Sequence, residues 1–293
     1  MTMAATSTAP AARPAPSPRA AMLVLPLLFL AAFLIAPMAL MVAYGFYGQD
    51  SLTGMPVRDL SLQNYWLILT DELYYLSILN SIEVTVIVTV ICLLIGYPIA
   101  YYVAVLAPPR WSGTLLLAII LPQWTSLLIR SFSWVAVLRP GGVVDWVLMG
   151  LGLTAQSLDL LYSRTAVIIG LVHVYLPFMI LGIHASLRSL DRSLVMAARD
   201  LGASPVSAFR RVVLPLTMPG IATGIALVAL PVFGAFVTPK LLGGASEVLV
   251  GNLIEVQFKE LGNWPLGSAL ATVVSLILLL GIALLIWAGR PRA

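Results

Sequence analysis

Six long stretches of the 293-residue sequence carry no formal charge, and they limit the possible folds more than any other feature. A helix needs about 20 predominantly apolar residues to cross the hydrocarbon core of a bilayer. Each stretch is long enough for one crossing. We therefore expect an all-α integral membrane protein with six transmembrane helices, over residues 22–46, 78–106, 114–137, 165–187, 217–240 and 265–288.

The composition supports this interpretation. Apolar side chains make up 60% of the chain and charged ones only 10%, whereas soluble domains average about 45–50% and about 25%. A soluble globular domain and extended disorder are both excluded for most of the length. The single cysteine, Cys92, gives neither a disulfide framework nor a metal cluster. Arginine outnumbers lysine, which we attribute to codon usage and not to a nucleic-acid site.

The distribution of charge predicts the orientation, because cytoplasmic segments of membrane proteins are enriched in Lys and Arg. With the N-terminus in the cytoplasm, the inner segments hold ten basic residues and the outer segments five. Nine acidic residues fall outside and two inside. We therefore expect both termini to be cytoplasmic. An acidic outer face would also attract cations by long-range steering.

The N-terminal region divides into two parts. Residues 1–20 are rich in Ala, Pro, Ser and Thr, which is typical of a disordered cytoplasmic tail. The apolar run that follows exceeds 20 residues, which is too long for the core of a secretory signal. We expect residues 21–74 to form a retained first transmembrane helix and an outer loop. A short outer helix is predicted over 143–151, after a turn at Gly141 and Gly142.

The long inner loop, residues 188–216, is predicted to hold two short helices. The first carries an apolar stripe, and Gly202 fits the position after its end. Ser204 and Pro205 fit the N-cap and first position of the second helix, which Arg210 and Arg211 would close. Two interpretations stay open from the residues alone. The pair docks into a groove on another protein, or it lies on the headgroups with its arginines paired to anionic lipid.

The same loop resembles the EAA signature of the permease subunits of ABC importers. The matching residues are Ala197-Ala198-Arg-Asp-Leu-Gly202, then nine residues, then Val212-Val-Leu214-Pro215. Met196 stands where the family has Glu. The resemblance implies a coupling helix that inserts into a cleft of a cytoplasmic ATPase. The coupling residues that it implies are Leu194, Ala197, Ala198, Leu201, Gly202, Ala203, Leu214 and Pro215.

Three further segments resemble spermidine/putrescine-type permeases, specifically the B-type subunit of a polyamine transporter. They begin at Leu121, Phe233 and Gly251. The resemblance implies the type I ABC importer permease fold over residues 75–288 and a multi-pass protein of the bacterial cell inner membrane. The implied partners are an ATPase dimer, a second homologous permease, an extracytoplasmic substrate-binding protein and membrane lipid, with no nucleic acid.

Charges and helix breaks inside the membrane indicate a substrate pathway. Glu83 and Arg130 are intramembrane charges, which are costly and usually functional. We expect Arg130 to pair with Glu83 or with a carbonyl and to order the outer gate, or Glu83 to line the pathway and meet an ammonium group. Pro122 and Pro231 interrupt spans near several aromatics, and helix breaks are tolerated where they line a cavity. The predicted pathway residues are Glu83, Trp124, Phe233 and Phe236.

Catalytic motifs are missing from the sequence. No Gly-x-x-x-x-Gly-Lys-Ser/Thr, His-Glu-x-x-His or Gly-x-Ser-x-Gly occurs. We therefore expect a transport subunit that is no enzyme, with no catalytic residue, metal or cofactor of its own, ATP and Mg²⁺ being held by the partner ATPase. Alternatives are an ABC permease for another amine-bearing solute (an opine or aminophosphonate), an ion-coupled secondary transporter, or a membrane enzyme.

Overall fold

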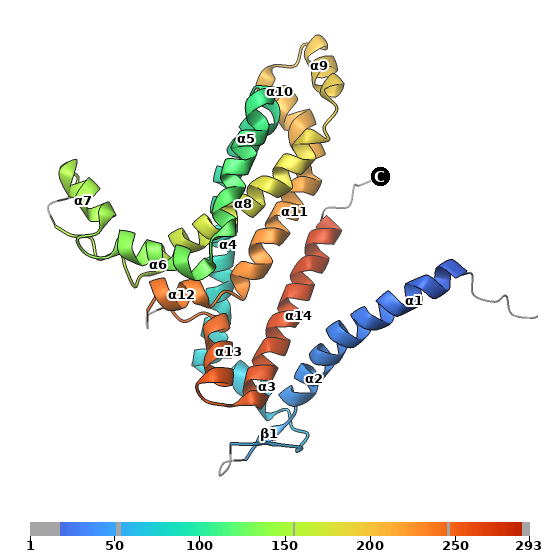
Figure 1. Cartoon of the computed structure of the whole chain (residues 1–293), viewed down its shortest axis with the longest axis vertical. Coiled ribbons are helices and arrows are strands. Elements are labelled where there is room, and N and C mark those ends of the chain that lie inside the picture. The colour runs from blue at the N-terminus through green and yellow to red at the C-terminus, as the bar shows by residue number, and fades with distance from the viewer. Residues whose placement is uncertain (1–17, 51–53, 155, 245–246, 289–293) are drawn as a thin grey trace, which may run out of the picture.

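The computed structural model describes residues 18–50, 54–154, 156–244 and 247–288, which are almost entirely helical (Figure 1). The first part contains α1 (Pro18–Leu30), η1 (Ala31–Ile35), α2 (Ala36–Gly45), β1 (Gly48–Gln49), β2 (Pro56–Val57) and α3 (Gln63–Thr70). The middle contains α4 (Glu72–Tyr101), η2 (Tyr102–Leu106), α5 (Pro109–Ile120), η3 (Leu121–Trp124), α6 (Leu127–Leu138), α7 (Val143–Gly150) and α8 (Arg164–Arg188). The last part contains α9 (Arg192–Asp200), α10 (Pro205–Ala208), η4 (Phe209–Val213), α11 (Leu214–Phe233), α12 (Val237–Leu242), α13 (Val250–Lys259) and α14 (Trp264–Ala288).

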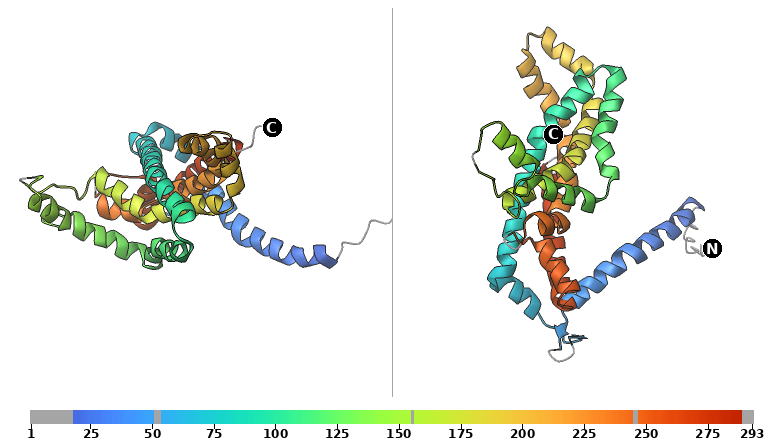
Figure 2. Two further views of the ribbon diagram at one scale, coloured as in Figure 1. Left: turned by 90° about the horizontal axis from the view of Figure 1, so that it is seen from above. Right: turned by 60° about the vertical axis from the view of Figure 1, so that its left-hand side comes forward.

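Six helical stretches within the described residues are long and apolar enough to cross a membrane, as the sequence predicts. They are Met22–Gly45, Glu72–Leu106, Leu127–Gly150, Arg164–Arg188, Pro205–Phe233 and Trp264–Leu284. The predicted tail falls largely outside the described residues, which begin at Pro18. The first span diverges from the other helices at its α1 end, while α2 lies beside α14 (Figures 1 and 2).

The third span differs from the prediction of one helix over residues 114–137. The chain instead forms α5, the 3₁₀ turn η3 and α6, with extended backbone at Thr125 and Ser126. Pro122 has no backbone N–H and cannot donate the hydrogen bond of a regular α-helix, which favours a kink or break at this point. The Thr125 hydroxyl donates to the Pro122 carbonyl oxygen at 2.7 Å and stabilises the turn. The apolar window therefore contains two helices that run in different directions (Figure 1).

The fifth span also differs from its predicted range of 217–240. The helix is continuous from Pro205 to Phe233 through α10, η4 and α11, and ends at Gly234. Residues after Gly234 form the separate short helix α12. The predicted short helix after Gly141 is confirmed as α7, and Gly141 has a φ of +69°, which glycine adopts without strain.

The main core forms where α4, α8 and α11 pack against one another. Glycines allow α8 and α11 to approach closely. A Cβ added at Gly182 of α8 would lie 2.7 Å from the backbone N of Gly224 in α11. A second core joins α3, α13 and α14 through Ile68, Val250 and Leu270. These two cores fix the positions of the helix ends that carry the candidate sites.

Candidate functional site

The loop between α8 and α11 presents α9 at one extreme end of the molecule (Figure 1). Hydrogen bonds fix both ends of this helix. The Ser193 backbone N–H donates to the Asp191 carboxylate at 2.9 Å; this bond, together with the Ser193 hydroxyl, lowers the pKa of Asp191. At the other end Gly202 has a φ of +85°, and the Ala203 N–H donates to the Ala198 carbonyl oxygen at 3.0 Å. The predicted glycine terminus is therefore confirmed.

One face of α9 carries apolar side chains that touch little of this chain. Leu194 and Ala197 are exposed, and Leu201 is 90% exposed. Val195, on another side of the helix, packs against the main core. An exposed leucine-alanine face on a capped, rigid helix is suited to insertion into an apolar groove of another protein.

The other predicted coupling residues fall into two groups. Ala198 lies on α9, and Gly202 and Ala203 form the turn that follows it. Leu214 and Pro215 instead begin α11, where Leu214 packs against the main core and Pro215 is exposed. The structure therefore gathers six of the eight residues at the tip of the loop and places two on the transmembrane helix.

The second loop helix begins as predicted but does not end at Arg210 and Arg211. The Ser207 N–H donates to the Ser204 hydroxyl at 3.2 Å, which confirms the N-cap. The chain then widens into the π-helical segment η4 and continues into α11. Pro215 explains the widening, because it cannot donate the hydrogen bond that a regular helix would direct to Arg211. The loop tip is thus continuous with a transmembrane helix.

Aromatic contacts hold η4 against α4. The Phe209 ring packs edge-on against Tyr97 and Tyr101, with ring centroids 5.7 and 5.8 Å apart. The Tyr97 hydroxyl also lies 3.0 Å from the Thr217 hydroxyl of α11. Such aromatic pairs add about 0.5–1.5 kcal/mol each beyond their buried area. The loop is therefore connected firmly to two core helices.

Of the two partners predicted for Arg130, Glu83 is wrong, whereas a carbonyl oxygen, that of the Gln123 side chain, is confirmed. The Glu83 carboxylate lies 2.7 Å from the guanidinium of Arg164, at the start of α8. Arg130 donates to the Gln123 side-chain oxygen at 2.7 Å, and Gln123 in turn donates to the Val174 carbonyl oxygen at 2.8 Å. The break between α5 and α6 places Arg130 beside Gln123 and α8, so that Glu83 finds a different partner.

The predicted pathway aromatics differ in accessibility. Trp124, at the end of η3, is 78% exposed, and Phe236, beside the break after α11, is 38% exposed. Phe233 is only 3% exposed and belongs to the second core. Trp124 and Phe236 therefore lie at the surface of this chain, whereas the Phe233 ring is covered by neighbouring side chains.

A network of charges that we did not predict lies on one side of Phe236. The Lys259 ammonium lies 5.6 Å from the centroid of the Phe236 ring and 3.3 Å from one carboxylate oxygen of Glu255. Lys240 lies 3.2 Å from both Glu255 and Glu260. The four-residue spacing of Glu255 and Lys259 was visible in the sequence, but their approach to Phe236 depends on the packing of α12 and α13. The network shows that this aromatic and these carboxylates accommodate ammonium groups.

The segment around α7 is organised by one buried carboxylate. Asp145 accepts hydrogen bonds from the Gly141 N–H, the Leu158 N–H and the Ser157 hydroxyl. The two sides of the loop are thereby held together. This loop therefore presents a defined surface, although no candidate residue had been assigned to it.

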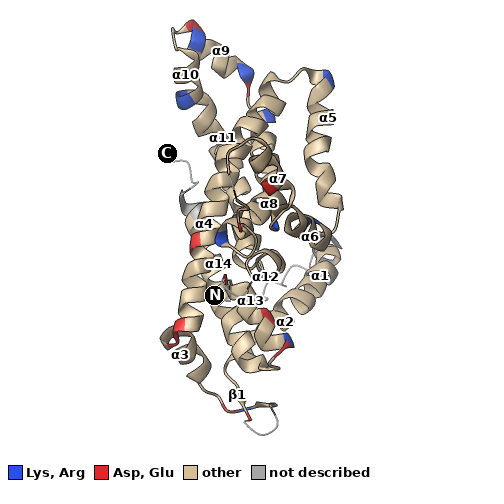
Figure 3. Cartoon of the chain, turned by 90° about the vertical axis from the view of Figure 1, so that its left-hand side faces the viewer, with Lys and Arg blue, Asp and Glu red and all other residues tan. Residues whose placement is uncertain are grey.

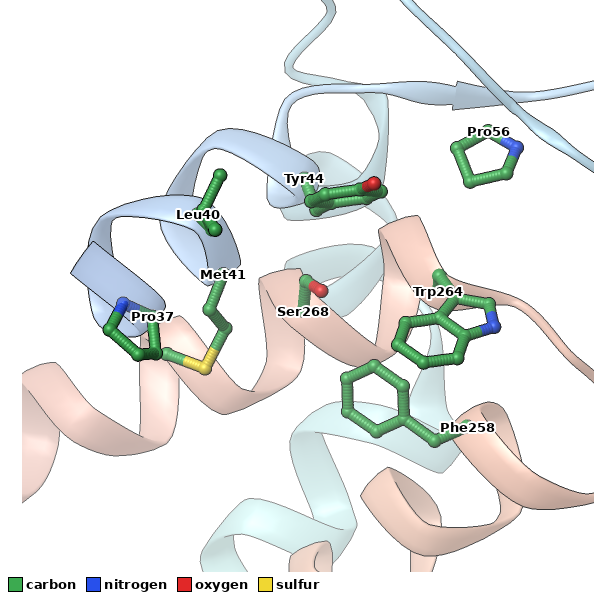
Figure 4. A pocket seen from close by; sticks show the side chains of 8 residues that line it. All are labelled: Pro37, Leu40, Met41, Tyr44, Pro56, Phe258, Trp264 and Ser268. Atoms are coloured by element: carbon green, nitrogen blue, oxygen red, sulfur yellow. The ribbon is translucent and has the colours of Figure 1, made fainter. Parts of the chain in front are cut away.

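An apolar pocket between α2 and α14 differs from the charged network beside Phe236 (Figure 4). Leu40, Tyr44, Trp264 and Ser268 are among its lining residues, and none of the lining residues is charged. The pocket therefore offers no carboxylate to a cationic solute.

Comparisons with known proteins agree with this geometry. The family described as "Binding-protein-dependent transport system inner membrane component" matches residues 96–290. The spermidine/putrescine transport system permease protein PotB of Escherichia coli (strain K12) is 38% identical over 264 residues, covering 90% of this chain and 94% of the relative. The protein of that name from Haemophilus influenzae is 40% identical over 248 residues, covering 85% and 86%.

Solved structures show the same fold. A bacterial alginate ABC transporter in complex with an alginate-bound periplasmic protein aligns with a TM-score of 0.69 and 18% identity, covering 92% of this chain and 93% of that chain. The MetNI methionine ABC transporter aligns with a TM-score of 0.52 and 19% identity, covering 78% and 95%. At these identities the likeness concerns the fold.

Proposed function

The chain belongs to the family of binding-protein-dependent transport system inner membrane components, and we propose that it is the permease subunit of an ATP-driven importer of spermidine, putrescine or similar polyamines. As a member of that family it is a transport component and no enzyme. The similarity to spermidine/putrescine permeases extends over most of both chains. It therefore supports the role of the whole subunit in transport.

The proposed substrate class is supported above all by the position of the Lys259 ammonium over the Phe236 ring. The ring is half-exposed, and Glu255 and Glu260 lie within the same network. Aromatic faces and carboxylates are the groups that recognise protonated amines in water. A polyamine carries several ammonium groups, so it can engage both kinds of group at once. We propose Trp124 and Phe236 as pathway residues on this basis.

The proposed orientation places α9 and both termini in the cytoplasm of a bacterial cell, with the spans in its inner membrane. Arginines gather at the end formed by α9, α10 and the start of α5 (Figure 3). That distribution agrees with the preference of basic residues for the cytoplasmic side. Residues 75–288 then form the transport domain, with the 188–216 loop as its cytoplasmic contact.

The proposed partners follow from the exposed surfaces and from the family name. The apolar face of α9 inserts into a groove of a cytoplasmic ATPase dimer, which holds ATP and Mg²⁺. A second, homologous permease completes the pathway. An extracytoplasmic binding protein delivers the solute to the outer segments, including the loop organised by Asp145. This chain contributes no cofactor.

In the proposed mechanism, ATP-driven closure of the ATPase dimer moves α9. The continuous helix from Pro205 to Phe233 transmits this movement toward the other side of the membrane, where the chain turns into Phe236. The spans then change from inward-facing to outward-facing, and ATP hydrolysis returns them. No covalent bond to the solute forms or breaks on this chain.

Reconstituted complexes test the proposal. Proteoliposomes without an ion gradient should accumulate spermidine only with ATP on the ATPase side. Leu201→Asp should abolish co-purification of the ATPase, whereas Leu60→Asp, at a leucine that is 81% exposed and far from α9 in sequence, should not. Uptake driven by an ion gradient alone would favour the secondary transporter. Selective uptake of an opine or aminophosphonate would retain the permease and change the solute, and activity of the isolated chain would favour a membrane enzyme.

A further inference from the structure

We propose that the groove between α9 and the adjacent ends of α4 and α8 binds an anionic phospholipid, with Arg192 and Arg199 holding its phosphate. The groove is lined by these two arginines, by Met196, and by residues at the ends of the core helices. The inference rests on the proposed orientation, which places this end of the chain at the cytoplasmic leaflet. It assigns a ligand to a surface that the transport mechanism does not use.

Helical periodicity separates the groove from the face proposed for the ATPase. With about 3.6 residues per turn, Arg192, Val195, Met196 and Arg199 share one side of α9. All four line the groove. Leu194, Ala197 and Leu201 lie on the opposite side and are exposed. One helix can therefore contact a protein on one side and a lipid on the other.

The groove combines an apolar floor with a basic rim. Val105 of η2, Leu187 of α8 and Val213 of η4 contribute to the floor. Arg192 and Arg199 are both exposed, and neither takes part in an ion pair with another described residue. The neighbouring Asp191 carboxylate is used to cap α9. Two guanidinium groups are thus available to an external anion.

Met196 explains why these arginines stay available. It follows Arg192 by four residues and precedes Arg199 by three, and side chains at both spacings are neighbours on a helix. A glutamate at this position, as in the EAA pattern, would lie within reach of both guanidinium groups and offset one of their two positive charges. The flexible thioether instead extends the apolar floor. With Met196 in place of that glutamate, this position adds no negative charge beside the two arginines, and the surface attracts anions.

A phospholipid satisfies both parts of this surface. Guanidinium groups bind phosphate oxygens in a bidentate manner, and the glycerol and acyl carbons can cover the apolar floor. The groove lies where the spans of α4 and α8 end, at Leu106 and Arg188, which is the depth of the headgroups. Basic pockets between transmembrane helices on the cytoplasmic side bind anionic headgroups in this way. A carboxylate of the ATPase would pair with the arginines but leave the floor uncovered.

Native mass spectrometry of the complete transporter tests the inference. The complex is released, in the absence of polyamine, from detergent micelles that contain phosphatidylcholine and phosphatidylglycerol. The lipid molecules that stay bound to the complex are then counted by mass. The wild type should retain phosphatidylglycerol about tenfold over phosphatidylcholine. Arg192→Gln/Arg199→Gln and Met196→Glu should each lose this preference. The control Arg210→Gln/Arg211→Gln, in the same loop but outside the groove lining, should keep it.

Two further measurements identify the ligand. Millimolar inorganic phosphate should not displace phosphatidylglycerol; displacement would mean that a free anion is the natural ligand and would overturn the lipid assignment. Unchanged lipid preference in Met196→Glu and the Arg192/Arg199 double variant would also overturn it. So would loss of the ATPase from both variants, because the arginines would then contact that partner. Spermidine uptake by the wild type is measured separately, so failure of the polyamine proposal is distinguishable.

Discussion

Replacing Gly182 with alanine should destabilise the protein, because α8 and α11 meet there through backbone atoms. An added Cβ would lie 2.7 Å from the backbone N of Gly224 and 2.8 Å from its Cα. An ordinary contact begins near 3.4 Å, so the helices would have to separate locally by 3.4 − 2.7 = 0.7 Å. Backbone atoms cannot rotate away as the end of a flexible side chain can. The strain must therefore spread into the main core.

The expected cost follows from the packing of protein interiors. Overpacking typically destabilises by about 1–3 kcal/mol, which changes an equilibrium by about 5–150-fold. The single cysteine gives a direct assay, because Cys92 is buried in the same core. Thiol labelling of this chain in the purified complex, followed by intact mass, measures how often that core opens. We expect Gly182→Ala to increase the labelling of Cys92 within this range.

Gly113→Ala is the matched control. Gly113 lies in α5, and an added Cβ would meet nothing within 4 Å. Alanine there should not destabilise and gains about 0.8–1 kcal/mol of helix propensity. Two results would refute the assignment of the close helix contact to Gly182. Cys92 would be labelled as slowly in Gly182→Ala as in the wild type, or it would be labelled as fast in Gly113→Ala as in Gly182→Ala.

Charged side chains at three other places supply the remaining predictions. The pKa of Asp191 is lowered, so its cap should stabilise α9 fully at pH values above the ordinary pKa of an aspartate and lose this effect as the pH falls through the lowered pKa. Because Asn does not titrate, the Asp191→Asn variant should keep its amide protection in acid, which hydrogen exchange measures. Glu83→Gln should reduce protein abundance by breaking the Arg164 pair; reduced uptake at unchanged abundance would instead place Glu83 in the pathway. The Lys259 ammonium competes with a bound amine for the Phe236 ring, a contact worth about 1 kcal/mol, so Lys259→Met should tighten spermidine binding to the purified complex about fivefold. Lys259→Arg keeps the positive charge and should leave the affinity unchanged. Equal spermidine affinities of the Lys259→Met variant and the wild type would contradict ammonium binding at Phe236.

The sequence predicted the features that depend on neighbouring residues. The number of spans follows from apolar length, the C-terminal end of α9 follows from Gly202, and the start of α10 follows from Ser204, whose hydrogen-bond partner lies three residues further on. Pro122 was recognised as a break, but a charge-free window measures length and does not show that the chain changes direction there. This is why one predicted helix became α5 and α6.

Features that depend on distant residues could not be predicted. Glu83 and Arg164 are 81 positions apart and meet only because α4 and α8 pack in one particular register. Arg130 was assigned to Glu83 because both were expected at a similar membrane depth, and depth does not specify which sides of two helices face each other. The same limit applies to Lys240 and Phe236, which reach Glu255 and Lys259 through the packing of α12 against α13.

The continuous helix from Pro205 to Phe233 relates the two candidate sites. Its 29 residues span about 43 Å at about 1.5 Å per residue, from the turn after α9 to the break before Phe236. Phe209 holds the α9 end against Tyr97 and Tyr101, while the α11 end stops at Gly234. A helix that is anchored along α4 and α8 cannot shorten, so a displacement imposed at α10 must either move its far end or be absorbed in the π-helical segment η4. The aromatic contacts of Phe209 oppose absorption in η4, so we expect movement at the proposed ATPase contact to reach the residues proposed to bind ammonium groups.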